Sequence, residues 1–193
     1  MKNFKTKITV SGKTHDTLYD IMPDNGPLKI LFIAKTPAPI SVIAGHYFQG
    51  RQGKMFWNKL KEYAILQVPN GTYEDEYLLQ NNYGLTDIVK VPRDYGNEPS
   101  DEEYINGLQR IIDLINKHKP TVIVFVYKKV LDNIMRLNFG IKSKSDYGFN
   151  QDLEKYFNSK VFVFPMPGTP CTTKEAIQSM LELKKMIAEK SED

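Results

Sequence analysis

The sequence predicts one three-layer α/β/α domain built around a central, mainly parallel sheet of four strands. Short apolar runs alternate along the chain with segments whose apolar residues recur at helical spacing. These runs are rich in β-branched and aromatic residues, which is typical of strands buried on both faces of a parallel sheet. The chain of 193 residues contains no repeat, low-complexity tract or long linker, so residues 1–193 are expected to share one core.

The N-terminal half of the chain supplies two of the expected strands. Residues 1–17 are polar and rich in turn residues, and we expect an N-terminal extension there with a short strand near residues 8–10. The apolar run LKILFI at 28–33 lies between turn signals and predicts a buried strand. Apolar spacing then predicts a helix over 56–65, and the next strand is expected at 88–91, directly before a proline.

Two capping boxes mark helix starts in the C-terminal half. Ser100 with Glu103 begins a long amphipathic helix that is expected to end before the next proline. Thr172 with Glu175 begins the last helix in the same way. The elements between these helices are a central strand at 121–126 (TVIVFV), a helix at 128–137 and a strand at 161–164 (VFVF).

Three segments are expected to carry the function, because ligands of such folds bind beyond the carboxyl ends of the strands. They are residues 34–57, 81–92 and 164–175. The first segment is a loop of about two dozen residues, a length that is uncommon in a compact domain unless the loop is functional.

Composition narrows the classes of function. Cys171 is the only cysteine, so an internal disulfide, a zinc thiolate cluster and an iron–sulfur centre are excluded. No G-x-G-x-x-G or Walker pattern is present, which argues against the usual nucleotide cofactors. A net charge of +3 permits a nucleic-acid partner without requiring one. The sequence contains neither a signal peptide nor a membrane span, so cytoplasmic residence without membrane contact is expected.

The three segments carry motifs in a familiar order. The first begins with AKTPA at 34–38, followed by GHYF at 45–48 and by a Phe-Trp pair at 56–57. The second contains YGLTDIV at 83–89, and the third contains FPMPGTP at 164–170. Together they resemble the mismatch-specific uracil/thymine branch of the uracil-DNA glycosylase superfamily, in which G-I-N-P-G, Y-G-I-T-N-L-V and L-P-N-P-S-G-L occupy these places.

The resemblance implies hydrolysis of the N-glycosidic bond of a flipped-out base in DNA, with uracil as the first expectation, leaving an abasic site. It implies a uracil-DNA glycosylase-like fold, DNA containing a damaged or mismatched base as partner, and no cofactor or metal. A monomer is expected, associated with the nucleoid if the source is bacterial or archaeal.

The same resemblance assigns residues to a base pocket. Phe48 stands where the family places the ring that stacks on the base, and Gly45 would let the backbone approach the base or sugar closely. Lys35, His46 and Asp87 are the other residues expected to line the pocket. A core phenylalanine and a plain turn glycine are the alternative interpretations.

Thr36 and Asp87 are the candidate catalytic residues. The family commonly has asparagine or aspartate where this chain has Thr36, and threonine can hydrogen-bond a water but cannot act as a carboxylate base. Asp87 stands where the family has asparagine or lysine, just before the expected strand. Its carboxylate could accept from a base N–H or activate water, or it could simply form a turn.

The third segment is expected to meet the DNA duplex. It matches the wedge that fills the gap left by a flipped base, although a rigid connector is the alternative. The start of the last helix could bind a phosphate through its free N–H groups. The residues assigned to the wedge and to phosphate contacts are Met166, Pro167, Gly168, Thr169, Pro170, Thr172 and Lys174.

Three other functions remain open from the sequence. The altered first motif could direct the enzyme to another deaminated base such as hypoxanthine. A second alternative is a DNA- or nucleotide-binding module that has lost catalysis. The third is an unrelated doubly wound protein that binds a small molecule.

Overall fold

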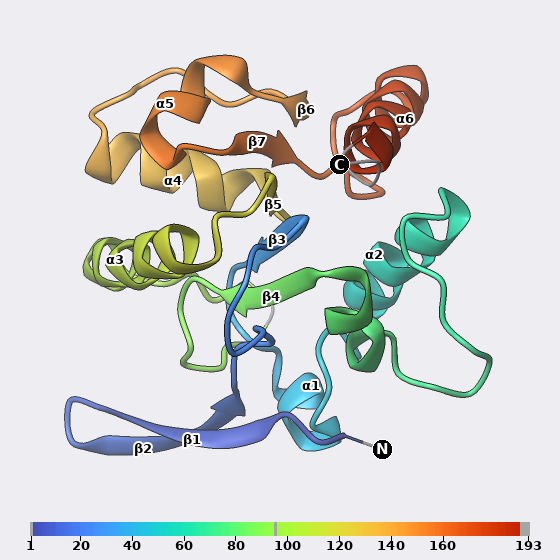
Figure 1. Cartoon of the computed structure of the whole chain (residues 1–193). Coiled ribbons are helices and arrows are strands. Elements are labelled where there is room, and N and C mark those ends of the chain that lie inside the picture. Colours follow the sequence, from blue (N-terminus) through green and yellow to red (C-terminus); the bar gives the residue numbers. More distant parts are fainter. Residues whose placement is uncertain (1, 95, 190–193) are drawn as a thin grey trace.

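A computed structural model describes residues 2–94 and 96–189 of the chain, and Figure 1 shows its layers. The expected α/β/α architecture with a mainly parallel sheet is confirmed, and the sheet has five strands in the order β4-β3-β5-β7-β6. The fifth strand, β6, runs antiparallel to β7. It is only two residues long, so the sequence contains no apolar run that would predict it. The strands are β3 (Ile30–Ala34), β4 (Tyr83–Asp87), β5 (Val122–Phe125), β6 (Gly148–Phe149) and β7 (Lys160–Val163).

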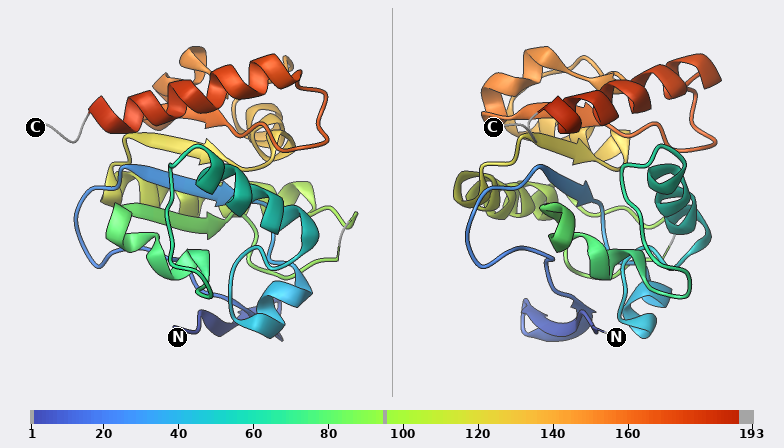
Figure 2. Two further views of the ribbon diagram at one scale, coloured as in Figure 1. Left: turned by 90° about the vertical axis from the view of Figure 1, so that its right-hand side faces the viewer. Right: turned by 45° about the vertical axis from the view of Figure 1, so that its right-hand side comes forward.

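Helices cover both faces of the sheet (Figure 2). Strand alternation sends Phe32 and Ala34 to one face, beneath α2 and α6, and sends Leu31 and Ile33 to the other, beneath α3 and α4. The four parallel strands therefore end at one common edge of the sheet. The helices are α1 (Pro39–Ala44), α2 (Arg51–Glu62), α3 (Asp101–His118), α4 (Lys128–Asn138), α5 (Glu154–Phe157) and α6 (Thr173–Glu189), with short 3₁₀ turns η1 (Glu74–Tyr77), η2 (Leu79–Asn81) and η3 (Gln151–Leu153).

Both capping boxes are present. The Ser100 hydroxyl accepts from the Glu103 N–H at 3.2 Å, and the Glu103 carboxylate accepts from the Ser100 N–H at 2.8 Å. Thr172 and Glu175 make the equivalent pair of bonds before α6. These reciprocal bonds satisfy N–H groups that the first turn of a helix leaves free.

The N-terminal residues form a two-stranded antiparallel hairpin, β1 (Lys5–Val10) and β2 (Lys13–Leu18), where a shorter strand was expected. The hairpin is anchored to the rest of the molecule by Phe4, whose side chain is buried and whose N–H donates to the Gly45 carbonyl at 2.9 Å. No helix in the described part of the chain is long and apolar enough to cross a membrane.

The structure corrects two expectations, one about the segment 81–92 and one about the segment 34–57. The strand expected at 88–91 lies earlier, and it ends at Asp87 because its partner β3 ends at Ala34 in the same register. Residues 88 and 89 follow the strand, stay buried against α3, and donate their N–H groups to the carbonyls of Ala34 and Lys35. The segment 34–57 is not one open loop, because α1 and the first turns of α2 lie within it. The expected helix at 56–65 accordingly starts at Arg51 and ends at Glu62.

Candidate active site

The carboxyl ends of β3 and β4 bring two of the sequence-predicted segments together. Ala34 is the register partner of Asp87, and the Val89 N–H donates to the Lys35 carbonyl at 3.0 Å. The half-buried Thr36 follows directly after this pairing. By strand alternation Asp87 lies on the same face as Leu85, the face that α2 covers.

Asp87 is the most unusual group at this edge. Asp87 is 1% exposed, and its Oδ2 atom has no hydrogen-bond partner at ordinary distance among the described residues, while the Lys90 ammonium and the Tyr47 hydroxyl both lie close enough to interact with the carboxyl. The Lys90 ammonium lies 3.6 Å from Oδ2, close enough for charge attraction but too far for a hydrogen bond. A buried oxygen without a donor is costly, so such a group calls for a ligand or another functional reason.

The surroundings of Asp87 shift its proton affinity. Burial raises the pKa of this carboxyl from 3.8 to about 6, and the negative charge of Asp20 adds to the rise. The positive charges of Lys90 and Arg110 act in the opposite direction and keep the pKa from rising further. Both charge states of Asp87 are therefore accessible close to neutral pH.

A network of charges surrounds this carboxyl. Asp20 accepts from the Thr86 hydroxyl at 2.6 Å and from the Lys90 ammonium at 3.0 Å. Arg110, from α3, donates to Asp20, to the Thr86 hydroxyl and to the backbone carbonyl of Asp87. Burial alone would raise the pKa of Asp20, but Lys90 and Arg110 outweigh burial and hold it below its usual value.

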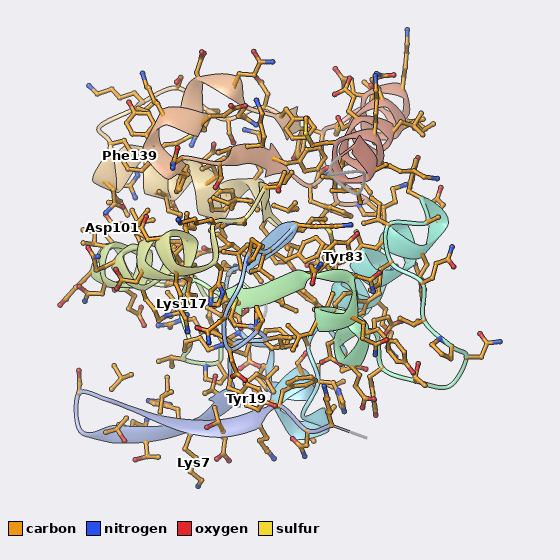
Figure 3. The ribbon with its side chains drawn as sticks, in the orientation of Figure 1. Lys7, Tyr19, Tyr83, Asp101, Lys117 and Phe139 are labelled. Carbon is orange, nitrogen blue, oxygen red and sulfur yellow. The ribbon has the colours of Figure 1, made fainter. Side chains whose placement is uncertain are left out.

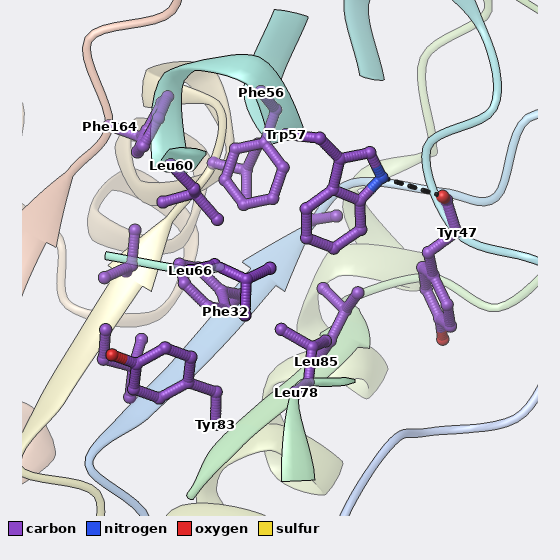
Figure 4. Packing of buried hydrophobic residues seen from close by; sticks show 14 of the residues in the cluster. Phe32, Tyr47, Phe56, Trp57, Leu60, Leu66, Leu78, Tyr83, Leu85 and Phe164 are labelled. Atoms are coloured by element: carbon purple, nitrogen blue, oxygen red, sulfur yellow. Dashed lines mark hydrogen bonds between the residues drawn. The ribbon is translucent and has the colours of Figure 1, made fainter. Parts of the chain in front are cut away.

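Tyr47 joins this network to the segment that carries Phe48. Its hydroxyl donates to the carbonyl of Tyr19, at the end of the hairpin, and accepts from the Lys90 ammonium at 2.9 Å. Its own carbonyl accepts from the Trp57 indole N–H at 3.2 Å (Figure 4). Tyr19 lies on the side of the hairpin that faces the sheet (Figure 3). Burial raises the pKa of the Tyr47 phenol well above its usual value, and the negative charges of Asp87 and Asp20 add to the rise.

Phe48 occupies the rim of an aromatic cluster. Its ring is half-buried and packs against Phe56 and Trp57, with centroids 4.8 and 5.4 Å apart. Its backbone has φ 57°, a left-handed conformation that is uncommon for a bulky residue and is often found at functional sites. A Cβ atom at Gly53 would lie 2.5 Å from the Phe48 Cα, so the first turn of α2 can approach Phe48 only with glycine there.

Gly45 and His46 hold the same loop from inside. Gly45 ends α1 in the left-handed conformation, and a Cβ there would meet the Asn3 side chain at 2.4 Å. The His46 ring is 3% exposed, bonds Asp75 at 2.9 Å and stacks on Tyr73 at 3.5 Å. Their placement does not support the expected contacts with a base, because both are packed against residues from other parts of the chain.

Lys35 is likewise engaged, in an ion pair with Glu98 at 2.7 Å. Burial would raise the pKa of Glu98, but the positive charges of Lys35 and Lys129 outweigh it and lower the pKa. Lys35 therefore ties the end of β3 to the segment before α3, and its placement does not support contact with a base.

The third segment divides into a buried wall and an exposed turn. Met166 is 6% exposed and belongs to the core, so its placement does not support the intruding role that the sequence suggested. Pro167, Gly168 and Pro170 are exposed, and Thr169 closes the turn by donating from its hydroxyl to the Met166 carbonyl at 2.7 Å.

The start of α6 is already occupied by a carboxylate. Glu175 accepts from both the N–H and the hydroxyl of Thr172, at 2.9 and 2.7 Å. This internal anion competes with a phosphate at the same N–H group, whereas Lys174 is exposed and faces no such competition.

A pocket of about 330 Å³ lies at the same edge of the sheet, after β5 and β7. Phe164 connects it to the aromatic cluster, with its ring 4.9 Å from that of Phe56. Thr36, Phe48 and Asp87 are not among its lining residues, so it adjoins their site instead of containing it. The lining residues are Val126, Tyr127, Lys128, Lys129, Asp132, Tyr147, Phe164, Met166 and Thr169.

Several important residues escaped the sequence reasoning. Tyr47 lies within the GHYF motif but was assigned no role, and Lys90 lies just outside its motif, three residues after Asp87. Arg110 and Asp75 carried no signal, because their partners lie far away in the sequence. Across residues 2–94 and 96–189, no group of three His, Cys, Asp or Glu side chains is arranged to hold a metal ion.

Comparison with known proteins agrees with this geometry. A family model described as "Uracil DNA glycosylase superfamily" matches residues 23–179. The chain is also similar to a G/U mismatch-specific uracil DNA glycosylase from Schizosaccharomyces pombe (strain 972 / ATCC 24843), with 24% identity over 136 residues. That alignment covers 69% of this chain and 42% of the relative, so this chain matches less than half the length of that protein.

Proposed function

This chain belongs to the uracil DNA glycosylase superfamily, and we propose that it hydrolyses the N-glycosidic bond of a damaged or mismatched base flipped out of DNA. The observation that carries this proposal is the buried Oδ2 atom of Asp87, which lacks a donor at the edge of the sheet beside the loop of Phe48. A flipped base would reach this buried carboxyl only after a local rearrangement, and it would then supply a hydrogen bond to Asp87 and stack on the half-buried Phe48 ring.

The charge of Asp87 determines which base edge fits. A neutral carboxyl group offers one donor and one acceptor, which match a carbonyl next to an N–H, as on uracil or hypoxanthine. An ionised carboxylate only accepts, so it matches an edge that presents N–H donors and repels a departing base anion. The neutral form of Asp87 is therefore the form that can bond both the carbonyl and the N–H of uracil or hypoxanthine.

Thr36 is proposed to place the attacking water. Departure of the base leaves positive charge on the sugar, and a hydroxyl group at the end of β3 can orient a water toward the sugar carbon without acting as a base. This weak role implies that much of the rate enhancement comes from stabilising the departing base.

The exposed turn at residues 167–170 and the adjoining pocket are proposed to contact the rest of the DNA. Pro167, Gly168 and Pro170 form a stiff tip that could fill the gap left by the flipped base. Lys128 and Lys129, at the wall of the pocket, supply positive charge for the phosphates beside it.

The test is cleavage of labelled oligonucleotides that carry uracil, hypoxanthine, xanthine or a thymine mismatch, followed by alkali to break abasic sites. Wild-type protein is expected to excise at least one base, and Asp87→Ala is expected to lose that activity. Lys160→Gln, at the opposite end of β7, is the matched control and should behave like wild type. If no oligonucleotide is cleaved, the glycosylase proposal is wrong.

A non-catalytic module is the second candidate, and Thr36 favours it, because the family's usual polar residue is absent there. Binding of uracil-containing DNA by wild-type protein without any cleavage would support this second function.

A further inference from the structure

Lys90 is held both through its backbone and through its ammonium group. Its carbonyl accepts from the Thr17 hydroxyl, and its ammonium bonds Asp20 at 3.0 Å and Tyr47 at 2.9 Å. The side chain is 14% exposed, and the ammonium lies 3.6 Å from the Oδ2 atom of Asp87. This fixed geometry means that the position of the charge beside Asp87 does not depend on a mobile side chain.

Four groups from four parts of the chain face Asp87. The cations are Lys90, after β4, and Arg110, on α3; the anion is Asp20, before β3; and the phenol is Tyr47, between α1 and α2. Arg110 directs its guanidinium to Asp20, to a threonine hydroxyl and to the Asp87 backbone. Lys90 is therefore the cation placed against the Asp87 carboxylate itself.

We propose that Lys90 is a positioning residue whose ammonium group sets the charge carried by Asp87, and thereby the hydrogen-bonding edge of a base that the site accepts. The part of this proposal that concerns bases rests on the proposed glycosylase function. The part that concerns charge does not.

The physical basis is a balance between burial and the charge of Lys90. Burial favours the neutral carboxyl and raises the pKa of Asp87 to about 6, while Lys90 stabilises the ionised form. An opposite charge at this distance lowers a carboxyl pKa by about one to three units. Without Lys90, Asp87 would stay neutral at and above neutral pH, and the site would accept a carbonyl next to an N–H over a wider pH range.

The experiment is a ¹³C NMR titration of the Asp87 carboxyl in the free protein, assigned by the signal that Asp87→Asn removes. Lys90→Gln keeps a donor for Tyr47 without a charge, and it is expected to raise the midpoint by about one to three units. Lys90→Arg retains the charge beside Asp87, and Lys160→Gln removes a charge far from Asp87. The Asp87 midpoint in both variants should therefore match that of wild type.

Asp20→Asn provides a second test with the opposite sign. Removing this anion is expected to lower the Asp87 midpoint, because the Asp20 charge contributes to the raised pKa. This variant keeps Lys90 in place, so it remains informative if Lys90→Gln does not fold.

The pH dependence of excision then connects charge to specificity. Lys90→Gln is expected to extend the excision of uracil or hypoxanthine to higher pH by the same shift as the titration. A midpoint that does not move in Lys90→Gln overturns the proposal, whether or not the protein excises a base. A shifted midpoint in a protein that cleaves no oligonucleotide supports the proposal on charge and overturns the glycosylase function.

Discussion

Replacing Asp87 by asparagine should stabilise the protein in a way that depends on pH. The pKa of Asp87 is raised from 3.8 to about 6, a shift of roughly two units. Each unit corresponds to about 1.4 kcal/mol of preference for the neutral form, so the folded protein loses about 3 kcal/mol when it must hold this carboxyl ionised. Asparagine has nearly the same shape and never ionises, so the variant escapes this loss.

The direction of this pH dependence follows from the pH at which the folded and the unfolded protein each bind the Asp87 proton. Below the unfolded value of 3.8 both states of the wild type are protonated, and the folded state is not penalised. Between 3.8 and about 6 the unfolded chain has released its proton while the folded protein retains it, so the free energy of unfolding falls as pH rises. Above that range the penalty is complete and constant.

Urea denaturation of wild type and Asp87→Asn across this range measures the effect. The difference in unfolding free energy should move by about 3 kcal/mol in favour of the variant as pH rises. Asp16→Asn, on the exposed face of the hairpin, controls for loss of a surface carboxylate. A difference that stays constant with pH, or one that moves in favour of wild type, would refute the assignment of a buried and destabilised carboxyl.

Three further predictions follow from the loop and its DNA contacts. Phe48→Ala should raise the activation free energy of excision by about 1–3 kcal/mol, because the ring stacks on a base once that base has left the duplex. Binding to undamaged duplex should not change, and equal losses in both assays would count against stacking. Gly53→Ala should lower the unfolding free energy by about 1–3 kcal/mol in urea, because its Cβ meets the Phe48 backbone. Gly50→Ala, at the N-cap of α2, meets only an ordinary contact at 3.6 Å and should lower the unfolding free energy less. Thr36→Asn should preserve or raise single-turnover excision and Thr36→Ala should slow it modestly, and identical rates would exclude Thr36 from catalysis.

Most of the fold could be predicted because its strands and helices carry local signals. The run TVIVFV contains β5, and the capping boxes at Ser100 and Thr172 locate the helices that follow them. The position of β4 could not be predicted in the same way. Ile88 and Val89 are as apolar as strand residues, but the strand ends where its neighbour β3 ends, and register is a property of the pair.

The candidate site could be predicted only in part, for a related reason. Phe48 and Asp87 were singled out because they lie within motifs beside strand ends. Lys90 lies only three residues from Asp87, but the network around them joins distant parts of the chain, since Tyr47 is 43 residues from Lys90, and Arg110 is 24 residues from Thr86. No periodicity or motif links such pairs, so the network emerges only from the packed structure.

Three destabilising features belong to the candidate site. Asp87 is buried with an oxygen that lacks a donor, Phe48 holds a strained backbone, and Gly53 is required by a close approach to it. Each feature reduces stability, and a fold tolerates such features where a site uses them. Lys90 and Arg110 reduce the free-energy cost of ionising the buried Asp87, but they do not remove it. If Asp87 contacts the base as proposed, an asparagine at this position would bind the same base edge at any pH, whereas the aspartate would bind both groups of that edge only when it is protonated.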